Sequence, residues 1–213
     1  MLRVPNVVPS MIVHDRRAIP STQQGCLMGY VDNIIVFGTE KDRVQELLRG
    51  VNSELRSVGL IVHEIQEGDS IVESLGWEFH REAQLIKPKS RRLWRLWYAL
   101  DHALVRGQLS GHQLHRLVGH YISMGLIRRE CLAVVNSCYA FCQAHPDHTN
   151  PLWPSVMREL RWMRSLIPYM MHRLVRPIMD RVLAFDASEW GKGVVQCKAS
   201  TADVNILVEV QDR

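Results

Sequence analysis

The spacing of apolar residues switches from a strand-type to a helix-type pattern and back again along the chain. These two switches limit the possible folds more than any other feature of the sequence. Residues 26–87 hold short apolar runs separated by turn residues, a pattern typical of strands, with one helical stretch among them. Residues 88–167 repeat their apolar positions every three or four residues, which predicts helices. Short apolar runs return after residue 180. The order predicts an α+β fold in which strands, helices and strands follow one another.

Two short apolar runs, 27–31 and 34–37, flank the polar residues Asp32 and Asn33. Asn and Asp accept the backbone geometry of tight turns, and both flanks are rich in β-forming residues. The segment is therefore predicted to form a strand, a turn at Asp32 and Asn33, and a second strand.

A helix is predicted over 40–58, where the apolar residues share one face, with Thr39 as its N-cap and Gly59 at its end. Residues 60–65 and 70–80 are rich in apolar and β-branched residues, so strands are predicted there.

The helical region is strongly basic. Residues 81–181 hold 16 Lys and Arg against 6 Asp and Glu, a net charge of +10, whereas the whole chain carries +4. Such a block between acidic flanks favours a polyanionic partner, with a solvated basic surface as the alternative. The predicted helices follow Pro88, follow a cap at Ser110, and cover 128–143 and 155–167. The predicted strands of the tail cover 181–188, 193–199 and 204–210.

The carboxylate at the first turn admits two interpretations. An acid at the end of a rigid hairpin can hold a divalent metal, and two such ions can assist an in-line phosphoryl transfer. A plain Asp-Asn turn is the simpler interpretation of the spacing alone.

Several segments resemble the reverse transcriptases of retrotransposons, which carry a tethered ribonuclease H domain. Residues 30–33, Tyr-Val-Asp-Asn, resemble the Tyr-x-Asp-Asp hairpin of that family. Residues 73–80 resemble its Leu-Gly-x-x-Phe hairpin, which grips the primer end, and 110–125 resembles the Leu-x-x-Leu-x-Gly helix of its thumb. Residues 182–195 resemble the opening strands of the ribonuclease H domain. The resemblance implies a partial polymerase palm, a helical thumb and the first strands of a ribonuclease H-like fold.

The implied organisation has five parts. They are an irregular lead-in (1–25), the second half of the palm with the primer-grip hairpin (26–87), a basic helical thumb (88–150), a linker and helix (151–180), and the start of a ribonuclease H-like fold (181–213).

The resemblance also implies site residues. The catalytic family positions are Asp32, Asn33 and Asp186, of which the two aspartates would hold Mg²⁺. The primer grip comprises Leu75, Gly76, Trp77 and Phe79. The family needs an acid from an earlier palm strand, which this chain begins too late to contain, and Asn33 replaces the second hairpin acid. Weak or absent magnesium binding is therefore expected, with no polymerase or ribonuclease H activity in this chain alone.

Cations interleaved with aromatic residues follow the primer-grip segment and resemble phosphate contacts beside an aromatic surface. They are Lys87, Lys89, Arg91, Arg92 and Arg95, with Trp94 as the exposed ring. Trp97 shares the apolar stripe and is predicted to lie in the core. The expected partner is a primer–template or an RNA–DNA hybrid.

Two other functions stay open. Cys138, Cys142, His145 and His148 have the spacing of a zinc site, although cysteines on an apolar helix more often pack in a core. A zinc-bound helical domain is one alternative. The other is a non-enzymatic module that self-associates through exposed apolar surface of the incomplete palm.

The sequence predicts an intracellular protein, cytoplasmic or nuclear. It has no run of about 18 apolar residues that could span a membrane, and its first residues lack the apolar core and cleavage site of a secretory signal. The five cysteines are an odd number and are widely spaced, and in a reducing compartment they are expected to be small buried hydrophobic residues.

Overall fold

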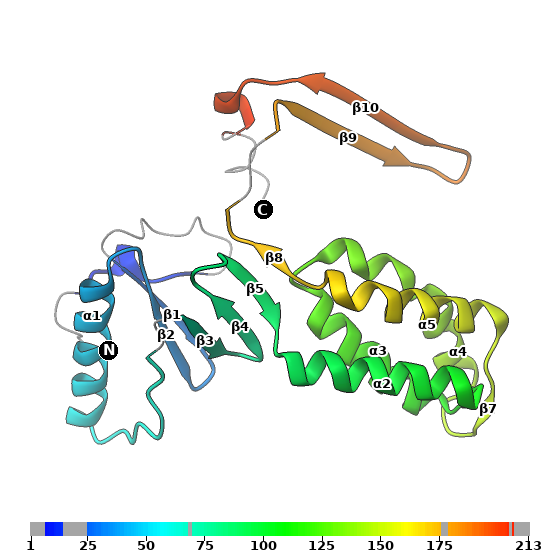
Figure 1. Ribbon diagram of the computed structural model, residues 1–213, viewed down its shortest axis with the longest axis horizontal. Helices are drawn as coiled ribbons and strands as arrows, with labels where there is room; N and C mark the ends of the chain where they lie inside the picture. Colours follow the sequence, from blue (N-terminus) through cyan, green and yellow to red (C-terminus); the bar gives the residue numbers. More distant parts are fainter. Residues whose placement is uncertain (1–6, 15–24, 68–69, 176–178, 205, 207–213) are drawn as a thin grey trace. The chain divides into compact units, whose positions relative to one another are not determined.

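The computed structural model describes residues 7–14, 25–67, 70–175, 179–204 and 206. Its fold is α+β, with small antiparallel sheets and several helices, as the sequence predicts (Figure 1). The chain divides into two compact units. One is Gln66–Arg176, and the other comprises Met1–Ile65 and Pro177–Arg213. The hairpin expected in the palm, over 70–80, therefore belongs to the same unit as the helices.

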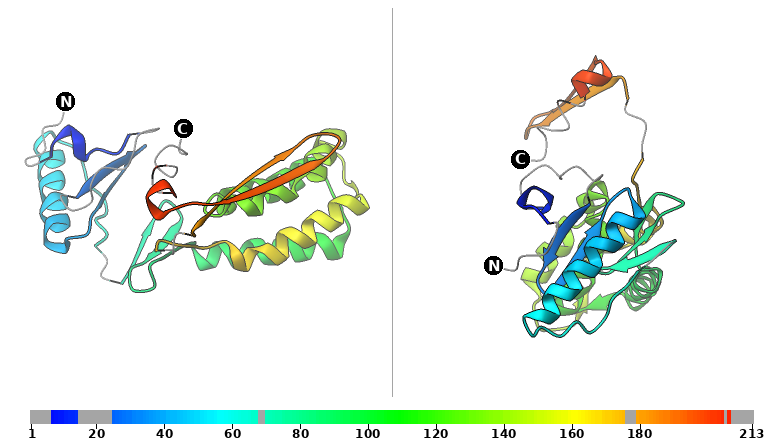
Figure 2. Two further views of the ribbon diagram at one scale, coloured as in Figure 1. Left: turned by 90° about the horizontal axis from the view of Figure 1, so that it is seen from above. Right: turned by 90° about the vertical axis from the view of Figure 1, so that its left-hand side faces the viewer.

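The first elements form a hairpin covered by one helix. They are η1 (Pro9–Met11), β1 (Cys26–Tyr30), β2 (Asn33–Phe37) and α1 (Lys41–Ser57). Helix α1 lies along the β1–β2 hairpin (Figure 2) and buries Leu47 and Val51 against Met11 and Leu27. The predicted hairpin and the predicted helix are both confirmed.

The turn of this hairpin lies one residue earlier than predicted. Tyr30 pairs with Asn33, so the turn residues are Val31 and Asp32, and Asn33 begins β2. In this register Leu27 lies opposite Val36, and both pack in the small core beneath α1. A turn at Asp32 and Asn33 would place Leu27 opposite Gly38, so packing selects the observed register.

The ends of α1 correct two further expectations. Its N-cap is Glu40 rather than Thr39. At the other end Gly59 has a φ of +81° and closes the helix as predicted, and the N–H of Leu60 donates to the carbonyl of Leu55. The strand predicted over 60–65 is wrong. These residues form no strand, because no neighbouring strand in the described part of the chain pairs with them.

The second unit begins with a four-stranded antiparallel sheet. Its strands, in spatial order, are β3 (Ile71–Ser74), β4 (Trp77–His80), β5 (Leu85–Pro88) and β8 (His172–Arg173). The strands predicted over 70–80 are confirmed as the β3–β4 hairpin. Strands β5 and β8 are not predicted by the sequence, since each is short and β8 pairs with a strand far away along the chain.

Helices make up the rest of this unit. They are α2 (Ser90–Arg106), α3 (Gly111–Gly125), η3 (Arg129–Val134), α4 (Asn136–Ala144), α5 (Pro154–Leu166) and η4 (Ile167–Tyr169), with a short β6 (Gln108–Leu109) paired to β7 (Asn150–Pro151). Helix α2 packs on α3 and α5, and α4 packs on the same two helices, which closes a ring around the main core (Figure 1). The largest fully buried side chains of this core include Leu100, Leu114, Tyr121, Phe141 and Leu160.

Helix caps explain where two of these helices begin. The Ser110 hydroxyl accepts from the N–H of Gln113 at 3.3 Å, and the Gln113 side chain accepts from the N–H of Ser110 at 3.1 Å, which confirms the predicted cap. The buried carboxylate of Glu159 accepts from the N–H groups of Ser137 and Cys138, at 2.8 Å each, and caps α4.

The continuous helix predicted over 128–143 is divided into η3 and α4. The Tyr121 hydroxyl donates to the carbonyl of Cys131 at 2.7 Å, and Glu159 holds the first N–H groups of α4. Both bonds occupy backbone groups that a continuous helix would pair internally. Contacts distant in sequence therefore place the break.

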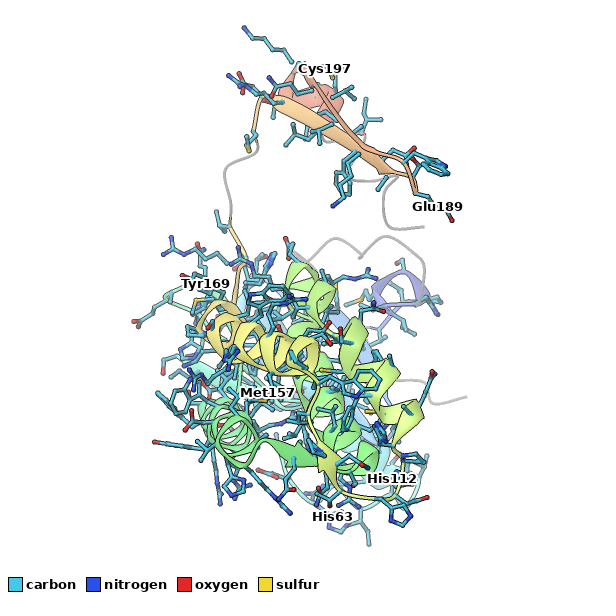
Figure 3. All side chains as sticks on the ribbon, turned by 90° about the vertical axis from the view of Figure 1, so that its right-hand side faces the viewer. His63, His112, Met157, Tyr169, Glu189 and Cys197 are labelled. Atoms are coloured by element: carbon cyan, nitrogen blue, oxygen red, sulfur yellow. The ribbon has the colours of Figure 1, made fainter. Side chains whose placement is uncertain are left out.

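The tail forms a separate hairpin, β9 (Arg181–Ala187) with β10 (Lys192–Lys198), as predicted. Figure 3 shows Glu189 at its tip and Cys197 near its other end. The strand predicted over 204–210 is wrong where the structure describes it, because 201–204 and Ile206 are helical. Ser200 and Asp203 cap the start of this helical segment reciprocally. The N–H of Asp203 donates to the Ser200 hydroxyl, and the N–H of Ser200 donates to the Asp203 carboxylate. Residues 205 and 207–210 lie outside the described part.

Candidate nucleic-acid interface

The β3–β4 hairpin has an unusual turn. Its two turn residues, Leu75 and Gly76, have φ angles of +51° and +86°, and Ser74 pairs with Trp77. Two-residue turns with positive φ at both positions usually carry Asn or Asp followed by Gly, because other side chains are strained there. Leucine at the first position points to a constraint other than turn stability.

This turn is fixed against the start of α2. The N–H of Lys89 donates to the carbonyl of Gly76 at 3.1 Å. The guanidinium of Arg92 lies so close over Gly76 that an added Cβ would overlap its Nη1 atom. Gly76 is thus required by its backbone angles, and a larger residue would also displace the guanidinium of Arg92. The predicted primer-grip residues and a predicted cation meet at this point.

A carboxylate strengthens the same junction. Glu78 on β4 accepts from the N–H of Ser90 at 2.8 Å, and its Oε2 lies 3.2 Å from both the Lys87 Nζ and the His80 Nε2. Burial alone would raise the pKa of Glu78, but the bonds from Ser90, His80 and Lys87 hold it below its usual value. The charged form of Glu78 therefore ties the hairpin to α2.

The predicted cations fall into two groups. Lys87 pairs with Glu78, and Lys89 pairs with Glu73 at 2.5 Å. These two lysines serve the hairpin junction in this structure, which lowers the charge that they offer to a phosphate. Arg91, Arg92 and Arg95 form no ion pair with any residue that the structure describes.

The outer face of α2 carries aromatic rings as well as arginines. Trp94 is 59% exposed, in agreement with the sequence, and Trp97 packs against the main core, as predicted. Tyr98 is 63% exposed, and its ring centroid lies 6.2 Å from that of Trp94. Tyr98 is not among the residues that the sequence singles out, although its position four residues after Trp94 places the two on one helix face.

The catalytic family positions lie at two hairpins. Asp32 lies at the exposed tip of β1–β2, where the Asn33 Nδ2 donates to its Oδ1 at 3.0 Å. Asp186 lies on β9, and its Oδ1 accepts from the N–H of Ala187 at 2.8 Å. Among the described residues, no three His, Cys, Asp or Glu side chains gather where they could hold a metal. A single carboxylate and an amide are too few ligands for a two-metal centre, so these residues do not fit the magnesium site that the resemblance implies.

The four residues with zinc spacing are not brought together. Cys138 is fully buried, and burial together with the neighbouring Glu159 raises the pKa of its thiol. Cys142 is half-buried, and burial raises its pKa as well. The His145 ring packs against Phe141 and Trp153, with centroids 4.9 and 5.8 Å away, and His148 is exposed. Packing in the helical core therefore accounts for the cysteines and for His145.

No family model matches the chain, and neither a curated protein nor a solved structure matches it. Within the described residues, every helix is too short or too polar to span a membrane.

Proposed function

We propose that this chain is a reverse transcriptase-like segment of a retroelement polyprotein that binds a primer–template or an RNA–DNA hybrid. The observation that carries the proposal is the β3–β4 turn, in which Leu75 takes a left-handed conformation and Arg92 lies over Gly76. A rigid turn with an adjacent arginine offers a phosphodiester a fixed cation and an apolar side chain at one place.

The order of the motifs supports the proposal. The Tyr-Val-Asp-Asn segment, the Leu-Gly-x-x-Phe segment and residues 182–195 each fall on an antiparallel hairpin. The Leu-x-x-Leu-x-Gly segment falls on α3, where Leu114 is buried. Each segment thus has the local structure that the resemblance implies for it.

Binding without catalysis is the proposed activity. The magnesium ligands implied by the resemblance are incomplete, so the proposed activity includes no chemical step. What remains for this chain is to hold nucleic acid at the hairpin junction, where Arg92 neutralises a phosphate. Such binding weakens with salt, with a slope of about −0.9 in log affinity against log salt for each phosphate contact on duplex.

The test is fluorescence anisotropy of a labelled RNA–DNA primer–template across a salt series, with primer extension followed in the same samples. Arg92→Gln is expected to weaken binding about fivefold and to make the salt slope shallower by about 1. The matched control is Arg106→Gln, which removes the same charge from an exposed residue in the last turn of the same helix. Equal losses in the two variants, or binding that does not respond to salt, would contradict the proposal.

A second variant distinguishes the role of the turn in binding from its role in stability. Leu75→Asn places a residue suited to left-handed backbone at the turn, so the thermal midpoint is expected to stay or rise. Duplex affinity is expected to fall because the apolar side chain is lost. If Leu75→Asn binds as tightly as the parent, the hairpin does not contact the nucleic acid.

One observation favours a second candidate, self-association. Val31, Tyr30 and Ile34 are exposed around the tip of the β1–β2 hairpin, which is the palm surface of the resemblance. Exposed apolar strands are association surfaces. Light scattering at low and high salt distinguishes the two functions, since apolar association persists in high salt whereas phosphate binding does not.

A further inference from the structure

The outer face of α2 is unused by the helical core and by the hairpin junction. Arg91, Trp94, Arg95 and Tyr98 occupy it at helical spacing, and all four are exposed. Trp94 makes an edge contact with Trp97, with centroids 6.2 Å apart and planes at 68°, so its ring is positioned while most of it stays exposed to solvent. A ring held in this way loses little conformational freedom when it binds a partner.

The two exposed rings suit flat ligands. The planes of Trp94 and Tyr98 are inclined by 35°, with 6.2 Å between their centroids. Nucleic-acid bases stack on aromatic side chains of this kind regardless of sequence, because every base has a π-face. Rings four residues apart on one helix can receive neighbouring bases of one strand.

The charges of this face match a nucleic-acid backbone. Arg91 and Arg95 flank Trp94 in the sequence and have no ion-pair partner among the described residues, as noted above. The one acid of α2, Asp101, pairs with Arg164 of α5 and so adds little negative field to the face. An arginine on either side of a stacked base is placed to contact its flanking phosphates.

We propose that the Trp94–Tyr98 face of α2 binds single-stranded nucleic acid, with bases stacked on the two rings and phosphates held by Arg91 and Arg95. A single strand is required because the bases of a duplex already stack on one another and leave no face free. This ligand and this surface differ from the duplex proposed for the hairpin junction, and the inference does not depend on that function.

The test measures anisotropy of a labelled single strand of about 12 nucleotides, a length within the usual site size, and of an abasic strand of equal length and charge. Trp94→Ala and Tyr98→Ala are each expected to weaken binding of the base-containing strand about tenfold, whereas Trp94→Phe keeps most of the affinity. The parent protein is expected to bind the abasic strand weakly.

The matched control is Trp162→Ala, which removes an exposed ring beside an arginine on α5. Far-UV circular dichroism verifies that each variant keeps its helices. Equal affinities for the two strands, or equal losses in Trp94→Ala and Trp162→Ala, would overturn the inference. So would a parent protein that binds no single strand, as expected if this face docks an acidic protein segment instead. Arg92→Gln in the duplex assay distinguishes a failure of this surface from a failure of the hairpin junction.

Discussion

The helical region around α2–α5 and the β9–β10 hairpin are both rich in apolar residues, yet they bury them very differently. In the helical region Leu100, Leu114 and Phe141 are completely enclosed. In the hairpin Phe185 is 83% exposed and Trp190 is 95% exposed. Each helix gathers its apolar residues on one face, so four helices can enclose a core.

The hairpin places apolar residues on both of its faces. Leu183 and Phe185 lie on one side, while Val182 and Ala184 lie on the other, since side chains alternate along a strand. Strands of this kind are usually covered on both faces. A local sequence pattern is therefore enough to form strands, whereas a buried core needs neighbouring elements. Mutations in the two regions should accordingly have contrasting effects.

The largest contrast is expected from truncating one phenylalanine in each region. Phe141→Ala empties a fully buried position and should lower the free energy of unfolding by about 3–5 kcal/mol. Phe185→Ala should change it by less than about 0.5 kcal/mol, because the side chain is mostly in water already. Chemical denaturation followed by far-UV circular dichroism measures both. A large loss in Phe185→Ala would show that the hairpin is covered in solution.

The next effect concerns the buried cap of α4. Glu159→Ala removes the acceptor of two backbone N–H groups and should cost about 2 kcal/mol of unfolding free energy. Glu159→Gln, which keeps one acceptor oxygen, should cost less. Glu189→Ala at the hairpin tip serves as the control and should have no measurable effect. The same denaturation experiment reports all three variants, and equal stability of Glu159→Ala and the parent would refute the capping role.

A smaller effect is expected from Tyr121. Burial raises its pKa, so the folded state keeps the phenolic proton at pH values where the unfolded chain has begun to lose it. The helical region should therefore lose stability as pH rises above about 10. Tyr121→Phe should remove that part of the pH dependence, at a cost of about 1 kcal/mol at neutral pH for the lost bond to Cys131. Thermal melting at pH 8 and pH 10.5 measures the difference, with the exposed Tyr169→Phe as the control.

The smallest effect is expected at the other exposed hairpin. Asp32→Asn should leave duplex affinity unchanged or slightly raised, because it removes a negative charge and no phosphate contact. Anisotropy with the primer–template measures it. A clear loss of binding would mean that the β1–β2 tip contacts the ligand through this carboxylate.

The sequence predicts those elements whose signals lie within a few residues. The hairpin around Asp32, the helix that Gly59 ends and the cap at Ser110 all follow from local spacing and short-range hydrogen bonds. The division between η3 and α4 escapes prediction because Tyr121 and Glu159 impose it from other helices. At the candidate interface, the sequence predicts the hairpin and the basic residues, but it does not predict that they are in contact.

The contact between Arg92 and Gly76 joins positions that only the path of β4 and β5 brings together, and the pairing of Lys87 with Glu78 has the same origin. A list of basic residues cannot show which cations are already neutralised. Helical spacing does show which ring of α2 packs inward, because it places Trp97 on the apolar stripe.

The burial of Cys138 beneath the Glu159 cap has a consequence for how the protein can be observed. Cys197, on the exposed hairpin, is open to a thiol-specific reagent, whereas the Cys138 sulfur meets that reagent only when the helices separate. The two thiols therefore give an internal comparison of labelling rates. The rate at which Cys138 is labelled, compared with Cys197, reports how often the helical core opens under native conditions.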